Sequence, residues 1–179
     1  GPAALGQSEL ARLAGVGAAV VRGLIAAGTL GETRETRDPP YPRLEPARPG
    51  KTLSAEQASA AQGLRQAVMA GGYGTTLLRG VTGSGKTEVY FEAIAACLEK
   101  GKQALVLLPE IALSAEFLAR VEARFGARPG AWHSAVPRAE RRRLWHACIT
   151  GTVGLVAGAR SALFLPFRDL GLIVVDEEH

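Results

Sequence analysis

Cysteine and long apolar runs are scarce in this chain of 179 residues. Its two cysteines, Cys97 and Cys148, lie far outside the C-x-x-C spacing of metal or redox pairs, and we interpret them as small core residues. Apolar runs reach only about ten residues, against about twenty needed to span a bilayer, and no signal peptide opens the chain. We therefore expect a cytoplasmic protein with no membrane partner.

The chain also has little net charge. The formal net charge is +4, which permits a nucleic-acid partner but does not require one. Hydrophobic residues make up 47% and charged residues 21% of the chain. This composition is typical of a globular protein rather than a disordered one. The length allows one sizeable domain together with a small accessory module.

The most informative segment is residues 80–87, Gly-Val-Thr-Gly-Ser-Gly-Lys-Thr. It matches the P-loop pattern G-x-x-x-x-G-K-[ST] and lies between an apolar run at 75–79, predicted to be a strand, and a run with helical spacing. Glycines allow a tight turn in which successive N–H groups face a phosphate. The cofactor-binding residues predicted from this pattern are Gly80, Gly83, Ser84, Gly85, Lys86 and Thr87.

Lys86 and Thr87 are expected to open the following helix, whose unpaired N–H groups and dipole favour an anion. The Lys86 ammonium would reach the β- and γ-phosphates, and the Thr87 hydroxyl would be a ligand of Mg²⁺. The predicted ligand is therefore a nucleoside triphosphate with its metal ion.

A second acidic element follows the apolar run 172–175, predicted to be the last strand. The end of this strand would deliver Asp176 to the phosphate loop as a Mg²⁺ ligand, and Glu177 would orient and deprotonate the attacking water. Together with Lys86, these two residues form the predicted catalytic set of a nucleotide hydrolase.

Strands and helices alternate after residue 51, which predicts an α/β lobe with a mostly parallel sheet and helices on both faces. Near-continuous apolar strands fit a sheet that is buried on both sides. The further predicted strands lie at 102–108, 131–133 and 153–156, and the further predicted helices at 54–70, 111–125 and 137–149, with Ser54 as an N-cap.

The first 38 residues predict a separate module. Helices at 8–14, N-capped by Ser8, and 18–27 around a glycine turn, followed by a possible β-ribbon at 30–36, indicate a partial winged helix. An ordinary helical hairpin is the alternative. Residues 39–50 are rich in proline and are predicted to form a semi-rigid linker to the lobe at 51–179.

The combined motifs resemble the PriA family of bacterial replication-restart helicases, in helicase superfamily 2. Asp176-Glu177-Glu178-His179 is similar to the D-E-x-H form of motif II. The resemblance covers nearly the whole chain, from the winged helix through the first RecA-like lobe to motif II. The segments that carry it are 80–90, 107–113, 158–167 and 176–179.

The resemblance implies an ATP-dependent helicase or translocase that moves 3′ to 5′ on DNA. It implies recognition of stalled or branched replication forks and promotion of primosome assembly in replication restart. ATP and Mg²⁺ are the implied cofactors, and zinc is expected in the parent protein at a site outside this chain. Implied partners are branched and single-stranded DNA, other primosome proteins, single-stranded DNA-binding protein and the replicative helicase loader.

Several residue roles also follow from the resemblance. Gln57 would read the adenine edge, since an amide offers both a donor and an acceptor; a solvent-facing helical glutamine is the alternative. His179 would couple the nucleotide site to the DNA site. The DNA-binding residues implied are Pro109, Glu110, Arg160 and Ser161.

Weaker candidates stay open. His133 and Ser134 could line the DNA face or belong to an ordinary loop, and the arginines at 138–143 could bind DNA or form a solvated helix face. Two positions depart from the family, Ala159 and Ser114, where threonine is common. Ala159 removes a hydroxyl that could contact phosphate.

The resemblance also implies a second lobe, which supplies an arginine that stabilises transition-state charge. No such lobe is found within these 179 residues. The chain is therefore expected to be a fragment that is inactive in unwinding by itself. Two other functions are weighed: a DNA- and protein-binding restart scaffold that has lost helicase activity, and a P-loop phosphotransferase. The intact Lys86, Thr87, Asp176 and Glu177 count against the first.

Overall fold

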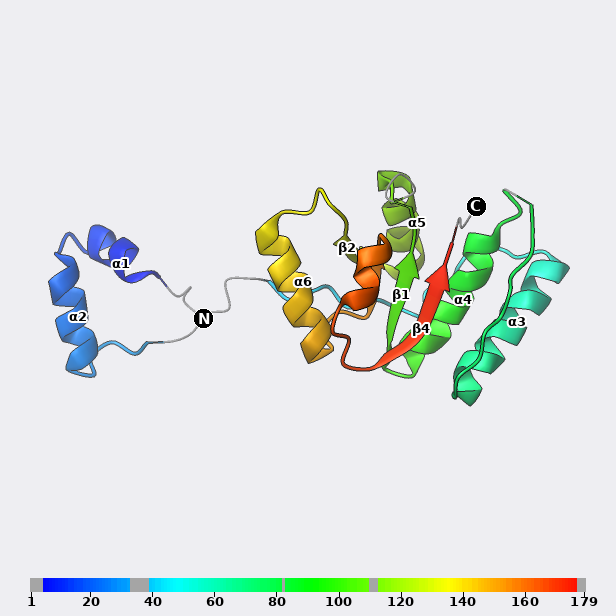
Figure 1. Ribbon diagram of the computed structural model, residues 1–179. Coiled ribbons are helices and arrows are strands. Elements are labelled where there is room, and N and C mark those ends of the chain that lie inside the picture. The colour runs from blue at the N-terminus through cyan, green and yellow to red at the C-terminus, as the bar shows by residue number, and fades with distance from the viewer. Residues whose placement is uncertain (1–4, 33–38, 82, 110–112, 177–179) are drawn as a thin grey trace. The chain divides into compact units, whose positions relative to one another are not determined.

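The computed structural model describes residues 5–32, 39–81, 83–109 and 113–176 (Figure 1). The chain divides into two compact units, residues 1–39 and 40–179. The larger unit contains a four-stranded sheet, its covering helices and every candidate site residue. Each unit is considered by itself.

The sheet of the larger unit is parallel throughout, with the spatial order β2-β3-β1-β4. Its strands are β1 (Gln103–Leu107), β2 (Gly130–Trp132), β3 (Leu155–Gly158) and β4 (Leu170–Val175). The two central strands, β1 and β3, are buried at every position because both their faces are covered. All carboxyl ends of a parallel sheet lie at one edge, where α/β proteins bind ligands.

Helices cover both faces of the sheet, which confirms the predicted fold class. Alternate residues of β1 separate two apolar cores. Ala104 and Val106 pack with α4 (Lys86–Glu99) and α5 (Ala115–Phe125), whereas Leu105 and Leu107 pack with α6 (Arg138–Thr150) and the 3₁₀ helix η1 (Arg160–Phe164). Cys97 and Cys148 are buried, one in each core, as expected of small apolar residues.

Helix α3 (Ala55–Ala70) packs against α4 beside the sheet. Its beginning is set by a capping box, in which the Ser54 hydroxyl accepts from the Gln57 amide and the Gln57 side chain accepts from the Ser54 amide. The predicted N-cap and the predicted end at residue 70 are confirmed. Within the described ranges no helix, α3 included, is long and apolar enough to cross a membrane.

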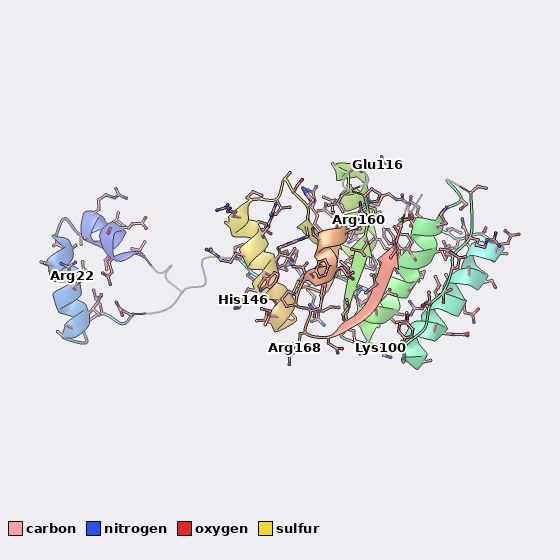
Figure 2. All side chains as sticks on the ribbon, in the orientation of Figure 1. Arg22, Lys100, Glu116, His146, Arg160 and Arg168 are labelled. Carbon is pink, nitrogen blue, oxygen red and sulfur yellow. The ribbon has the colours of Figure 1, made fainter. Side chains whose placement is uncertain are left out.

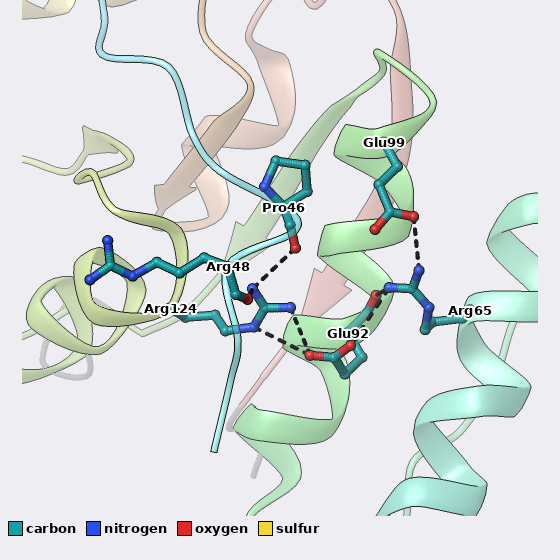
Figure 3. Close-up of polar contacts among 6 residues, drawn as sticks. All are labelled: Pro46, Arg48, Arg65, Glu92, Glu99 and Arg124. Atoms are coloured by element: carbon teal, nitrogen blue, oxygen red, sulfur yellow. Dashed lines mark hydrogen bonds and ion pairs between the residues drawn. The ribbon is translucent and has the colours of Figure 1, made fainter. Parts of the chain in front are cut away.

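A buried ion pair fixes α4 between its neighbours (Figure 3). The Glu92 carboxylate of α4 accepts from the Arg124 guanidinium of α5 at 2.8 Å and lies 3.6 Å from the Arg65 guanidinium of α3. Arg124 also donates to the backbone carbonyls of Pro46 and Arg48. The helix that follows the P-loop is therefore held from both sides.

The proline-rich segment differs from the expected spacer. Residues 40–50 lack regular structure, as their prolines predict, but they pack along the larger unit. Leu44 is buried, the Glu45 amide donates to the Phe125 carbonyl at 2.8 Å, and the Tyr41 hydroxyl donates to Glu140 at 2.6 Å. Two side chains and one backbone amide between the prolines therefore hold the segment against the lobe. The proline content of the segment does not predict these contacts.

The predicted strand at 75–79 is wrong. These residues form no strand and appear as a loop between α3 and α4 in Figure 1. Leu77 is 81% exposed. An extended apolar run becomes a strand only when its backbone groups pair with a neighbour, and β4, the strand at this end of the sheet, pairs within the described residues with β1 alone.

The smaller unit contains two short helices, α1 (Gln7–Leu13) and α2 (Ala18–Ala26), which contact each other across a glycine turn. The predicted N-cap at Ser8 is wrong. Gly6 occupies that position and Ser8 lies inside the helix. Residues 33–36 of the predicted β-ribbon lie outside the described residues, so the winged helix stays a prediction.

Candidate functional site

The P-loop connects the segment before it directly to α4. Gly83 and Gly85 have φ angles of 78° and 81°, in the left-handed region that favours glycine. A Cβ on Gly80 would lie 2.6 Å from the Ser84 hydroxyl, and one on Gly85 would lie 2.6 Å from the Gln57 amide. The left-handed backbone therefore favours glycine at Gly83 and Gly85, whereas the close contact at Gly80 is with a side-chain hydroxyl that can rotate. Thr82 lies outside the described residues.

Lys86 and Thr87 are the first two residues of α4, as predicted. The Lys86 ammonium donates to the carbonyls of Gly80 at 2.7 Å and Val81 at 3.0 Å. The cation is thus held above its own loop. A phosphate oxygen placed there would replace these carbonyls as the acceptor, and the exchange would be favoured by its charge.

Gln57 lies against the P-loop rather than facing only solvent. Its side-chain NH₂ donates to the Ser84 carbonyl at 2.9 Å, while its side-chain oxygen accepts from the Ser54 amide at 2.8 Å. Both ends of the amide are therefore engaged in this structure. Contact with an adenine would require the side chain to exchange at least one of these bonds, so base reading stays a prediction.

Asp176 follows β4 directly and meets α4. Its amide donates to the Leu107 carbonyl at 3.0 Å, which continues the pairing of β4 with β1. One carboxylate oxygen accepts from the Tyr90 hydroxyl at 2.7 Å. Since Tyr90 lies one helical turn after Thr87, this bond brings the predicted Mg²⁺ ligands Thr87 and Asp176 to the same place. Glu177 and His179 lie outside the described residues.

Sequence reasoning assigned no role to Tyr90. Burial raises the pKa of its hydroxyl well above 10.0, and the hydrogen bond to the Asp176 carboxylate raises it further. The phenol therefore stays protonated and acts as a donor. The only available signal was its spacing, three residues after Thr87, which places both side chains on one face of the helix.

Glu88, beside the P-loop, was also missed. Its carboxylate accepts from Arg120 at 2.9 Å and lies 3.2 Å from the Lys51 ammonium. Burial by itself would raise the pKa of Glu88, but the hydrogen bonds from these two cations outweigh burial and lower it. Glu88 is therefore an ionised anchor between α4, α5 and the segment before α3.

The predicted DNA-contacting residues follow neighbouring strands. Pro109 comes after β1, and Arg160 and Ser161 begin η1 after β3. Figure 2 shows Arg160 at the carboxyl edge of the sheet, whereas Arg168 lies at the opposite edge. The fold therefore collects Pro109, Arg160 and Asp176 along one edge. Glu110 lies outside the described residues.

A tryptophan supports Ser161. The Trp132 indole N–H donates to the Ser161 hydroxyl at 3.2 Å, and the Ala159 amide donates to the Trp132 carbonyl at 2.9 Å. Ser114, the other departure from the family, uses its hydroxyl to cap α5 by accepting from the Phe117 amide. Ser114 therefore uses its hydroxyl in the fold, and Ala159 contributes a backbone amide.

The arginine cluster 138–143 is not a single surface. Arg141 donates to the carbonyls of His133 and Ser134 and lies over the Trp132 ring at 5.8 Å. Arg143 pairs with Glu140 and covers the Tyr41 ring at 4.2 Å. Only the two remaining arginines of the cluster, Arg138 and Arg142, are exposed.

The donor set at Thr87 and Asp176 fits Mg²⁺, which takes hydroxyl and carboxylate oxygens and keeps several waters. Within the described residues there is no group of three or more histidine, cysteine, aspartate or glutamate side chains suited to a metal ion. A site with one protein carboxylate and one hydroxyl is typical of an ion bound together with nucleotide phosphates rather than by protein alone.

Comparison with known proteins defines the class. Residues 54–179 match the family model of the DEAD/DEAH box helicases, and the chain belongs to this family. The matched region begins at the Ser54 N-cap and includes the P-loop, the whole sheet and Asp176.

Within this class, the chain is similar to curated proteins named replication restart protein PriA, which confirms the resemblance seen in the sequence. That of Bacillus subtilis is 38% identical over 174 residues, 96% of this chain and 22% of its own length. That of Rickettsia felis is 54% identical over 104 residues, 58% of this chain and 16% of its own. That of Chlamydia muridarum is 42% identical over 128 residues, 72% of this chain and 17% of its own. The chain thus spans between 16% and 22% of the length of these relatives.

Proposed function

We propose that this chain is the nucleotide-binding lobe of an ATP-dependent DNA helicase that acts in replication restart. The protein would move 3′ to 5′ on DNA, recognise stalled or branched forks and promote primosome assembly in the cytoplasm. The observation that carries the proposal is the meeting of Asp176 with the P-loop helix at the sheet edge that also carries Arg160.

The lobe's residues would divide the work of binding and hydrolysis. Lys86 and the loop amides would hold the phosphates, and Thr87 and Asp176 would hold Mg²⁺, which neutralises charge on the phosphates when bound. Glu177 would orient the attacking water and accept its proton. A transition-state arginine is expected from a second lobe, so this chain by itself would bind nucleotide with little turnover.

DNA would contact the same sheet edge. Arg160 and Ser161 would contact the DNA phosphate backbone without reading sequence, as arginine and hydroxyl contacts do. Pro109 and Glu110 would belong to the same surface, where the single strand is gripped. His179 would connect this surface with the nucleotide site. Partners such as primosome proteins, single-stranded DNA-binding protein and the helicase loader, and a zinc site outside this chain, are part of the same proposal.

Replacement of Lys86 by alanine tests nucleotide binding. We expect K86A to weaken binding of fluorescent N-methylanthraniloyl-ATP in Mg²⁺ by about 10- to 100-fold, the loss of a charge-assisted hydrogen bond of about 1.5–3 kcal/mol. Lys102→Ala is the matched control, because Lys102 pairs with Asp169 at the opposite edge of the sheet. Equal affinities of K86A and the unmodified chain would refute the site.

DNA-stimulated turnover separates the alternatives. In a longer protein that carries this lobe, ATP hydrolysis stimulated by single-stranded DNA should be lost in K86A. Turnover missing from the unmodified protein would favour the scaffold function. Turnover indifferent to DNA but stimulated by a small-molecule acceptor would favour a phosphotransferase.

A further inference from the structure

Tyr90 lies in the core behind the candidate nucleotide site and contacts one of its residues, Asp176. The residue is 5% exposed, and its ring packs edge to face on Phe91 at a centroid distance of 5.4 Å. It belongs to the apolar core between α4 and the sheet. The ring direction is therefore set by packing, and only the hydroxyl reaches the polar side of that core.

That hydroxyl connects two elements that are distant in the chain. It donates to Asp176 at 2.7 Å across a separation of 86 residues. Thr87 lies one turn earlier on the same helix, on the same face as Tyr90. Tyr90 thus connects the helix that begins with Lys86 and Thr87 to the carboxylate after β4.

We propose that Tyr90 is a positioning residue for the nucleotide-bound Mg²⁺, because its hydroxyl fixes the orientation of the Asp176 carboxylate beside Thr87. The inference rests on the proposed nucleotide site and extends it to a residue behind the ligands. Tyr90 does not touch the nucleotide. It restricts rotation of the Asp176 side chain, so that the carboxylate is already oriented when the ion arrives.

The chemistry of the bond suits this role. An O–H donor to a carboxylate forms a short, charge-assisted bond, and this one is 2.7 Å long and comes from a residue that is 5% exposed. Partners behind a metal ligand orient it, and their loss typically costs 10- to 100-fold in metal affinity. A core-packed ring provides such a partner with little conformational freedom of its own.

Tyr90→Phe removes the hydroxyl and keeps the ring in the core. The chain is titrated with N-methylanthraniloyl-ATP in the presence of Mg²⁺ and again in EDTA. We expect Y90F to raise the dissociation constant about tenfold in Mg²⁺ and to leave the value in EDTA unchanged. Asp176→Asn should also raise the dissociation constant in Mg²⁺ and leave the value in EDTA unchanged. Adding Y90F to D176N should raise the dissociation constant in Mg²⁺ no further.

Tyr41→Phe is the matched control. Tyr41 also donates its hydroxyl to a carboxylate, that of Glu140 at 2.6 Å, but on the proline-rich segment. Y41F should leave the Mg²⁺ dependence unchanged. If Y90F and Y41F behave alike, or if Y90F weakens binding equally in Mg²⁺ and in EDTA, Tyr90 has only a structural role and the inference is overturned.

A second measurement follows the Tyr90 hydroxyl in the unmodified chain and uses variants only to assign signals. The chain contains three tyrosines, Tyr41, Tyr73 and Tyr90, so carbon-13 labelling at the tyrosine ζ carbon gives three signals, which Y41F and Tyr73→Phe assign. Adding Mg²⁺ and the nucleotide should shift the Tyr90 signal alone. Nucleotide binding with an unmoved Tyr90 signal overturns the inference, whereas undetectable binding by the unmodified chain overturns the proposed function itself.

Discussion

Gln103 illustrates what one buried side chain does in this lobe. Its NH₂ donates to the carbonyls of Cys148 and Val153, and its side-chain oxygen accepts from the amides of Arg168 and Asp169. All the hydrogen-bonding capacity of the amide is used. Gln103 therefore joins the start of β1, the end of α6 and the turn before β4.

Gln103→Leu should destabilise the fold. The Cys148 carbonyl and the Arg168 amide bond each other, but the Val153 carbonyl and the Asp169 amide would each lose the partner that Gln103 provides. We expect the free energy of unfolding in urea to fall by about 2–6 kcal/mol, at about 1–3 kcal/mol for each of the two unsatisfied groups. Gln66→Leu on the exposed face of α3 should change it by less than about 0.5 kcal/mol. Equal effects would contradict this account.

Residues of the P-loop could be predicted from sequence because their signal is local. Gly83, Gly85 and Lys86 act within a single turn, so spacing alone indicates their geometry. Tyr90 and Gln103 could not be predicted, since their partners lie 86 and 45 to 66 residues away. Their contacts exist only after the strands have been ordered in the sheet.

At the scale of elements, α4 is held by an ion pair that also binds the proline-rich segment. The Arg124 side chain is 6% exposed and donates to Glu92 and to two carbonyls of that segment. Figure 3 shows these contacts converging on one guanidinium. Removing Arg124 takes the donor from both carbonyls and leaves Glu92, which is 24% exposed, with Arg65 as its remaining cation.

Arg124→Met should therefore lower the free energy of unfolding by about 2–3 kcal/mol, less than the roughly 3–5 kcal/mol of a fully buried pair, because Glu92 keeps Arg65. It should also speed trypsin cleavage after Arg43, because the segment loses its anchor. Arg128→Met is the matched control, in the turn that follows the same helix. Its pair with Glu122 is exposed, 64% on the arginine side, and should contribute less than about 1 kcal/mol. Similar losses in R124M and R128M would show that burial does not decide the strength of this pair.

At the scale of the whole lobe, the two ends of the parallel strands carry different kinds of residues. The carboxyl ends of β1, β3 and β4 carry Pro109, Arg160 and Asp176. The opposite edge carries Arg168 and Lys102 in structural contacts, with the Thr150 carbonyl and with Asp169. Positive charge occurs at both edges, so composition does not say which edge would bind DNA.

Arg160→Ala and Arg168→Ala test this asymmetry. R160A should weaken binding of fluorescein-labelled single-stranded dT20 several-fold and lower the slope of log affinity against log salt by about one, as for one lost phosphate contact. R168A should leave both values unchanged. Fluorescence anisotropy in a salt series measures them. A greater loss in R168A would place the DNA on the other edge.

The sequence by itself determined the four strands of the sheet and the phosphate loop. Apolar runs specified β1, β3 and β4, and glycine spacing specified the P-loop, because these features depend on neighbouring residues. Tertiary structure alone decided the order β2-β3-β1-β4, the docking of residues 40–50 and the loop conformation of 75–79. Each of these depends on a pairing partner that is remote in the chain, and local pattern contains no information about which partner is in reach.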